Sequence, residues 1–112
     1  MKTFAQALDL VDDPALIAEY EAYHRAVWPE VRAALRSIGI LDMKIFRIGN
    51  RLFMTFEAPD DFVPERDFLA YTEVARAREW DDLMRRFQRP APAAPEGAWW
   101  APMTKVFDID WE

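Results

Sequence analysis

The stretch ILDMKIFRIGNRLFMTFEA, residues 40–58, decides the fold. It contains two apolar runs on either side of Gly49 and Asn50, a pair that tolerates positive φ in a tight turn. These runs predict a β-hairpin. In the second run, Leu52 and its alternate neighbours point one way while Phe53 and its neighbours point the other, and apolar residues occur in both sets. We therefore expect both faces of this sheet to be covered.

A helix interrupted by proline precedes the hairpin. Asp13 is placed to cap the free amides of a helix that begins at Pro14. Pro29 lacks an amide hydrogen and forces the residue before it out of helical dihedral angles, so we expect a break within residues 25–28 and a restart at Pro29. The second segment has the spacing of a core-facing helix and ends at Gly39.

The remaining segments complete the element order. Residues 2–10 alternate as a first strand, and residues 67–88 form a long helical region with one or two apolar stripes. The proline-rich residues 89–98 predict a connector over the surface, and residues 103–111 are expected to form the last strand.

This order predicts a single α+β domain over residues 1–112. Strand, broken helix, strand, strand, helix and strand make up the split βαβ arrangement of ferredoxin-like folds, in which one sheet face carries the helices. The apolar residues on both sides of the hairpin then predict that a second copy covers the open face, in a homodimer, or that an equivalent cavity does.

The composition narrows the range of possible functions. A net charge of −6 with scattered basic residues argues against nucleic acid as a partner, and no apolar run is long enough to span a membrane. The chain has no cysteine and one histidine, so we expect no metal and no thiolate chemistry. No glycine-rich phosphate loop occurs. These features predict a cytoplasmic protein without a cofactor.

Tyr20 and His24 are the candidate reactive pair. They are one helical turn apart and so share a face of the first helix. Histidine is the side chain best matched to proton exchange near neutral pH, and a tyrosine beside it adds a hydroxyl. Spacing alone nevertheless favours a helix-end histidine bonded to a backbone carbonyl and a tyrosine packed in the core.

Tryptophans and acidic pairs add weaker signals. Five tryptophans permit a sugar site, because a sugar ring stacks on indole, but they also fit ordinary core packing. The acidic pairs in VDD, PDD and WDD are interpreted as solvated faces and helix caps.

Four segments resemble the L-rhamnose mutarotase family: EYEAYHRAVWPEVRAALRSIGI, RLFMTFEAPDDF, AREWDDLM and GAWWAPMTKVFDID. The similarity covers nearly the whole chain. It implies a dimeric α+β barrel that interconverts the α and β anomers of a deoxy sugar, with no metal or organic cofactor. By similarity, His24 takes the position of the proton donor, Tyr20 that of a substrate-binding tyrosine, and Trp80 that of one tryptophan of a substrate-binding pair.

Two positions depart from the rhamnose-specific pattern. Met43 stands where those members carry a tyrosine, and Glu79 precedes Trp80 where they carry a second tryptophan. Such changes alter which sugar hydroxyls find a partner. Relatives with this variant pattern look like L-fucose mutarotases, so we expect L-fucose to be preferred over L-rhamnose. The similarity leaves open the identity of the base and whether Trp28, Trp99 or Trp100 lines the site.

Other functions share this fold. Dimeric α+β barrels also include cofactor-independent monooxygenases and haem-degrading enzymes, although fold analogy alone is a weak warrant. A haem enzyme would develop a visible absorption band on titration with haem. A non-catalytic sugar-binding module would bind a sugar without accelerating anomer exchange.

Overall fold

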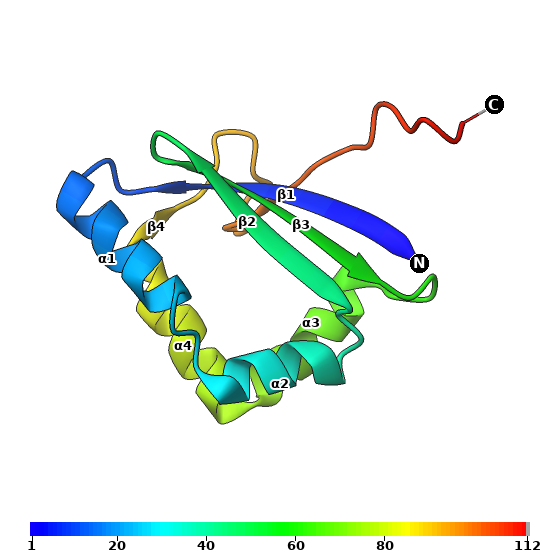
Figure 1. Ribbon diagram of the computed structural model, residues 1–112, viewed down its shortest axis with the longest axis horizontal. Helices are drawn as coiled ribbons and strands as arrows, with labels where there is room; N and C mark the ends of the chain where they lie inside the picture. The colour runs from blue at the N-terminus through cyan, green and yellow to red at the C-terminus, as the bar shows by residue number, and fades with distance from the viewer. Residues whose placement is uncertain (112) are drawn as a thin grey trace.

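The computed structural model describes residues 1–111. It follows the predicted order of strands and helices up to the end of the second helical region (Figure 1). The elements are β1 (Lys2–Leu10), α1 (Pro14–His24), α2 (Pro29–Ser37), β2 (Asp42–Ile48), β3 (Arg51–Ala58), α3 (Pro64–Glu73), α4 (Ala75–Arg85), β4 (Gln88–Arg89) and β5 (Ala101–Pro102).

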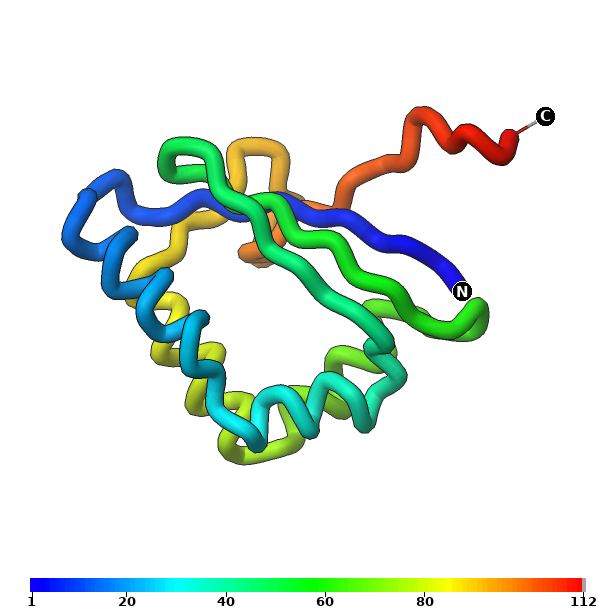
Figure 2. The backbone as a smooth tube through the Cα atoms, in the orientation of Figure 1, coloured from blue at the N-terminus to red at the C-terminus, as the bar shows by residue number. Residues whose placement is uncertain are grey.

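The strands form one antiparallel sheet in the order β2-β3-β1-β4, with β5 also paired to β1. The long central pair is β1 with β3, whose register runs from Lys2 opposite Ala58 to Asp9 opposite Arg51. This is the strand order of a ferredoxin-like sheet. All four helices lie on the same face (Figures 1 and 2). The α+β, ferredoxin-like prediction is confirmed.

Local signals in the first half of the chain are confirmed. Asp13 accepts hydrogen bonds from the amides of Ala15 at 2.9 Å and Leu16 at 3.3 Å, and Pro14 is the first residue of α1. The helix ends at His24 and α2 begins at Pro29. Gly39 adopts a φ of 105° just after α2, a conformation that ends helices and that glycine adopts without steric cost.

The long helical region differs from the expectation. It begins three residues earlier, at Pro64, and Asp67 accepts a hydrogen bond from the amide of Val63 at 2.8 Å. It is also two helices, because Val74 has extended dihedral angles between α3 and α4. No glycine or proline marks this break in the sequence. Gln88, expected to end the helix, is instead the first residue of β4.

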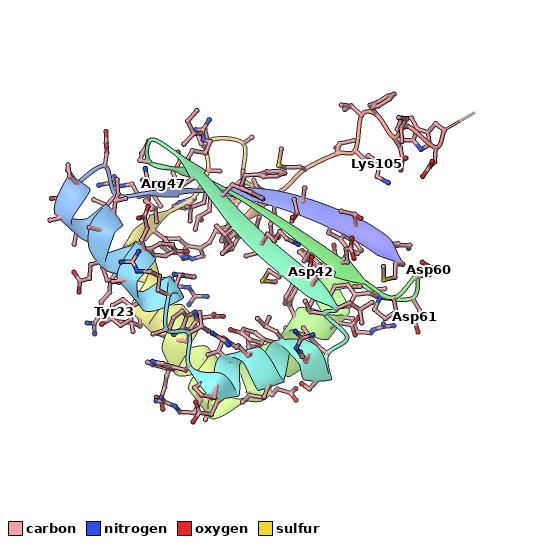
Figure 3. All side chains as sticks on the ribbon, in the orientation of Figure 1. Tyr23, Asp42, Arg47, Asp60, Asp61 and Lys105 are labelled. Atoms are coloured by element: carbon pink, nitrogen blue, oxygen red, sulfur yellow. The ribbon has the colours of Figure 1, made fainter. Side chains whose placement is uncertain are left out.

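The prediction of a last strand at residues 103–111 is wrong. Only Ala101–Pro102 pair with β1, and the amide of Met103 donates to the Ala5 carbonyl at 2.9 Å before the chain leaves the sheet. In this register Val106 would lie opposite Lys2, where β1 begins. The register therefore excludes pairing with β1 for residues 107–111 only, whereas residues 104–106 leave the sheet although β1 still lies opposite them. The tail, residues 103–111, projects away from the sheet with its side chains, including the labelled Lys105 (Figure 3).

The main core lies between the sheet and the helices. Buried side chains from β1, β3 and all four helices form it, and a second cluster comprises Ile40, Met54, Phe56, Ala58 and Phe62. The first comprises Leu8, Leu10, Tyr20, Val31, Ala34, Leu52, Tyr71, Ala77, Trp80, Met84 and Phe87. No helix described within residues 1–111 combines the length and apolar character needed to cross a membrane.

The opposite sheet face is exposed and apolar. Phe46 and Ile48 on β2 are 56% and 81% exposed, and Phe53 lies directly across from Phe46. The tail is similar, since Val106 and Ile109 are each 85% exposed. Within one chain, the expectation that both faces of the hairpin are covered is therefore not met.

Candidate active site

A cavity of about 340 Å³ lies between the helices and the inner face of the sheet. Its volume is at the lower end of the range typical of small-molecule sites, and most of its wall is apolar with a few polar groups, as in such sites. The polar lining residues are Gln6, Tyr20, His24, Tyr71, Thr72, Asp81, Arg85 and Gln88. The cavity thus offers hydroxyl, amide, imidazole, carboxyl and guanidinium groups around a space enclosed by aromatic and aliphatic side chains.

His24, the last residue of α1, lines this cavity. Its Nδ1 lies 3.0 Å from the carbonyl oxygen of Tyr20. A carbonyl can only accept, so Nδ1 carries the proton of this bond in both the neutral and the charged ring. Nε2 is therefore the nitrogen that gains or loses a proton. The hydrogen bond to a backbone carbonyl expected of a helix-end histidine is present, and it orients the ring while leaving Nε2 free of it.

Burial sets the proton affinity of His24. It lowers the pKa of His24 below 6.5, because the charged ring loses hydration, and the hydrogen bond to Tyr20 offsets this only in part. At neutral pH the neutral ring, with a free lone pair on Nε2, is thus the main form. A histidine in this state accepts a proton and returns it at little cost.

Tyr20 is buried against His24, with ring centroids 4.3 Å apart. Burial raises the pKa of Tyr20 to about 12, although the neighbouring Gln88 side chain acts in the opposite direction. The phenol therefore stays protonated at neutral pH. It can donate a hydrogen bond into the cavity, which it also lines.

Trp80 lines the cavity and packs against both His24 and Trp28. It is 5% exposed, and its ring lies 5.4 Å from that of His24 and 5.1 Å from that of Trp28. Trp28 is absent from the cavity lining and is covered by the guanidinium of Arg76, 3.9 Å from its ring. Trp99 and Trp100 do line the cavity. The three residues expected at the site, Tyr20, His24 and Trp80, are therefore neighbours.

The two departures from the rhamnose-specific pattern lie in different places. Met43, on β2, lines the cavity. Glu79 is exposed on α4, pairs with Arg76 at 2.7 Å and is not among the lining residues. Of the two substitutions, only Met43 is thus in a position to contact a molecule in the cavity.

Six polar lining residues were missed from the sequence: Gln6, Tyr71, Thr72, Asp81, Arg85 and Gln88. Asp81, read as part of a solvated pair, is half-buried, and its Oδ1 accepts a hydrogen bond from the hydroxyl of Tyr71 at 3.2 Å. That interpretation is wrong for Asp81 and right for Asp82, which is exposed. Gln6, on β1, donates only to the thioether of Met54, a weak acceptor, at 3.2 Å. Its amide remains available to a polar ligand.

No cluster of three or more metal-ligating side chains occurs among residues 1–111. The cavity instead combines a proton-exchanging imidazole, a phenol that stays protonated and several hydrogen-bonding groups on an aromatic wall. Such a set suits a small polyhydroxylated molecule that reacts by proton transfer. Fold and cavity together define a small ferredoxin-like α+β protein with a largely apolar cavity beneath its sheet, lined by a few polar and titratable side chains.

Comparisons with known proteins identify the family. The family model for L-rhamnose mutarotase matches residues 3–109. A UPF0734 protein from Dictyostelium discoideum is 55% identical over 98% of this chain and 91% of its own length. An L-fucose mutarotase from Xanthomonas campestris pv. campestris is 39% identical over 97% of this chain and 89% of its own length.

A solved structure agrees in fold. The crystal structure of an L-rhamnose mutarotase from Formosa agariphila has a TM-score of 0.72 over 98% of this chain and 100% of that chain, at 22% identity. The chain therefore belongs to the L-rhamnose mutarotase family. It is an aldose mutarotase, an isomerase that interconverts sugar anomers. The resemblance inferred from the sequence is confirmed.

Proposed function

We propose that this enzyme interconverts the α and β anomers of a 6-deoxy sugar, with L-fucose preferred over L-rhamnose, and that His24 is its catalytic residue. The observation that carries this proposal is the orientation of His24. Its Nδ1 is held by the Tyr20 carbonyl, at 3.0 Å, while the ring lines the cavity. Nε2 is left to exchange a proton with a bound sugar.

The reaction requires two proton movements. Opening of the pyranose ring needs a proton delivered to the ring oxygen and one removed from the anomeric hydroxyl. The open aldehyde then rotates about the bond to C2 and recloses on its other face. His24 carries one of these protons, and a placed side chain of this kind accelerates a reaction by about 100-fold to 10,000-fold.

Tyr20 and Trp80 bind the sugar in this proposal. The Tyr20 phenol, which stays protonated because burial raises its pKa to about 12, donates a hydrogen bond to a sugar oxygen. Trp80 supplies an aromatic wall beside His24, against which an apolar face of the sugar can pack. Both side chains are buried, so the fold holds them in place before the sugar arrives.

The preference for L-fucose rests on Met43. A methionine at this point of the cavity wall offers no hydroxyl to a sugar, and a sugar hydroxyl left without a partner against a largely apolar wall is costly. The similarity to an L-fucose mutarotase, 39% identical over 97% of this chain, supports the same choice. L-rhamnose is the alternative substrate.

The test is saturation transfer between the α and β anomer signals in NMR spectra. Catalytic amounts of protein are added to L-fucose, L-rhamnose and a panel of other aldoses, with folded His24→Ala protein as the control. We expect fastest exchange for L-fucose. Faster exchange of L-rhamnose would overturn the sugar assignment alone, and undiminished exchange by His24→Ala would remove His24 from the chemistry.

A homodimer is the second part of this proposal. Phe46 and Ile48 on the open sheet face are 56% and 81% exposed, and the tail carries Val106 and Ile109 at 85% exposure. Apolar patches of this kind mark interaction surfaces. A second copy stacked sheet to sheet covers both features at once, because each copy presents the same apolar face and the same projecting tail.

A further inference from the structure

Asp81 is a titratable group in the cavity that proton exchange by His24 does not use. It follows Trp80 on α4, is half-buried and lines the cavity together with His24. The Tyr71 hydroxyl donates to its Oδ1 at 3.2 Å. Its other oxygen, Oδ2, has no hydrogen-bond or ion-pair partner within residues 1–111. A half-buried carboxyl that is oriented on one oxygen and free on the other is available to a ligand, because carboxylates removed from water are normally paired.

The charged groups around Asp81 leave it without an ion pair. Arg85, one turn further along α4, contacts the neighbouring Asp82 at 3.3 Å and lies 5.8 Å from the ring of Trp99. Tyr71 from α3 and Tyr20 from α1 face Asp81 as neutral hydroxyls. The carboxyl therefore meets the cavity as a group able to take or give a proton.

We infer that Asp81 is the second catalytic group of this mutarotase, exchanging a proton with one sugar oxygen while Nε2 of His24 exchanges a proton with the other. The inference rests on the proposed function, because it assigns the partner that proton exchange by His24 requires. The anomeric hydroxyl and the ring oxygen share one carbon, so two groups lining one cavity can serve both.

Ring opening and closure need only one proton shared between His24 and Asp81. Neutral His24 takes the proton of the anomeric hydroxyl through Nε2, and protonated Asp81 gives its proton to the ring oxygen as the C1–O5 bond breaks. This leaves an open aldehyde, a charged His24 and an ionised Asp81. After rotation, ionised Asp81 takes the proton of the C5 hydroxyl, the oxygen attacks C1, and His24 returns its proton to the carbonyl oxygen. The enzyme ends as it began.

Proton affinities support this pairing. Burial raises the pKa of Asp81 to about 6 and the Asp82 carboxylate adds slightly to this, while the Tyr71 hydrogen bond and Arg85 act in the opposite direction. Burial also lowers the pKa of His24. Burial thus favours the neutral form of both groups, an imidazole that can take a proton and a carboxyl that can give one, and these are the forms that the step uses. Tyr20 and Tyr71 stay protonated, because burial raises the pKa of each.

The experiment compares Asp81→Asn with Asp82→Asn, a matched change at the exposed neighbouring carboxylate. Exchange is measured at saturating L-fucose and L-rhamnose, and affinity by quenching of tryptophan fluorescence. We expect Asp81→Asn to lower exchange at saturation by about 100-fold or more. Its affinity should stay within about threefold, with Asp82→Asn equal to the parent. Asp81→Glu, which keeps the carboxyl, should recover at least about tenfold of the loss.

The pH profile separates catalysis from structure. The parent should show a bell-shaped dependence, since exchange stops when both groups are protonated or both are deprotonated. The pH profile of Asp81→Asn should keep only one limb of the bell, whereas that of Asp82→Asn should keep both. Exchange by Asp81→Asn within about threefold of the parent, or a lower affinity with full exchange at saturation, would overturn the inference. A parent profile with a single limb would also overturn it, even if Asp81→Asn failed to fold. A parent that exchanges no sugar would instead refute the proposed function.

Discussion

Replacing Asp81 by asparagine should make the protein more stable at alkaline pH. The pKa of Asp81 rises from 3.8 to about 6 because its carboxylate is buried. Each tenfold change in proton affinity corresponds to about 1.4 kcal/mol, so ionised Asp81 destabilises the folded state by at most about 3 kcal/mol. Water in the cavity screens part of this, so we expect about 1–3 kcal/mol. Asparagine keeps the acceptor for the Tyr71 hydroxyl and removes the charge.

The sign follows from proton binding. Because the pKa of Asp81 is higher in the folded protein than its ordinary 3.8, the folded state binds more protons between about pH 4 and 6. The contribution of Asp81 to stability is therefore fully present below about pH 4 and is lost as the pH rises through 6. The gain from Asp81→Asn should be near zero at pH 4 and complete by pH 8.

Urea unfolding followed by tryptophan fluorescence measures this difference. The parent, Asp81→Asn and Asp82→Asn are compared at pH 4 and pH 8 and at one protein concentration, because association shifts apparent stability. Asp82→Asn should change the free energy of unfolding by no more than about 0.5 kcal/mol, since Asp82 is exposed. A less stable Asp81→Asn protein at pH 8, or a difference that does not change with pH, would refute the reasoning.

Four further outcomes are expected. His24→Ala should lower anomer exchange by about 100-fold or more in NMR saturation transfer while circular dichroism stays unchanged, and Tyr20→Phe should have a milder effect. Met43→Tyr should raise the ratio of L-rhamnose to L-fucose exchange; an unchanged ratio would separate Met43 from specificity. Sedimentation should show a dimer at micromolar concentration, and Ile48→Lys should weaken it by placing a charge on the open sheet face. Chelation should leave the exchange rate unchanged, whereas loss of activity restored by one metal would contradict the mechanism.

Sequence reasoning succeeded where the cause is local. The break at Pro29 and the cap at Asp13 follow from the chemistry of one residue and its immediate neighbours. The shared face of Tyr20 and His24 follows from the helical repeat. The fold then followed from the order of these elements.

It failed where the cause is distant in the chain. The tail leaves the sheet after Met103, although residues 104–106 would still lie opposite β1 in this register, and no glycine or proline within residues 103–111 marks that point. The break at Val74 has no proline or glycine to mark it. Asp81 was read as solvated because its partner, Tyr71, lies ten residues earlier on the other side of that break. The cavity around Asp81 exists only once the helices are packed.

Reactivity and instability have the same origin at Asp81. Carboxylates elsewhere in the molecule pair with cations that hold their pKa values down, as the Arg66 guanidinium does for the pKa of Asp67 and the Lys105 ammonium for the pKa of Asp108. An ion pair of that kind would hold the pKa of Asp81 down and leave it ionised near neutral pH, without a proton to give. Burial without a paired cation instead keeps the pKa of Asp81 raised, and the same burial makes its charged form costly to the fold. Replacing Asp81 should therefore lower the rate of anomer exchange and, at the same time, raise the free energy of unfolding.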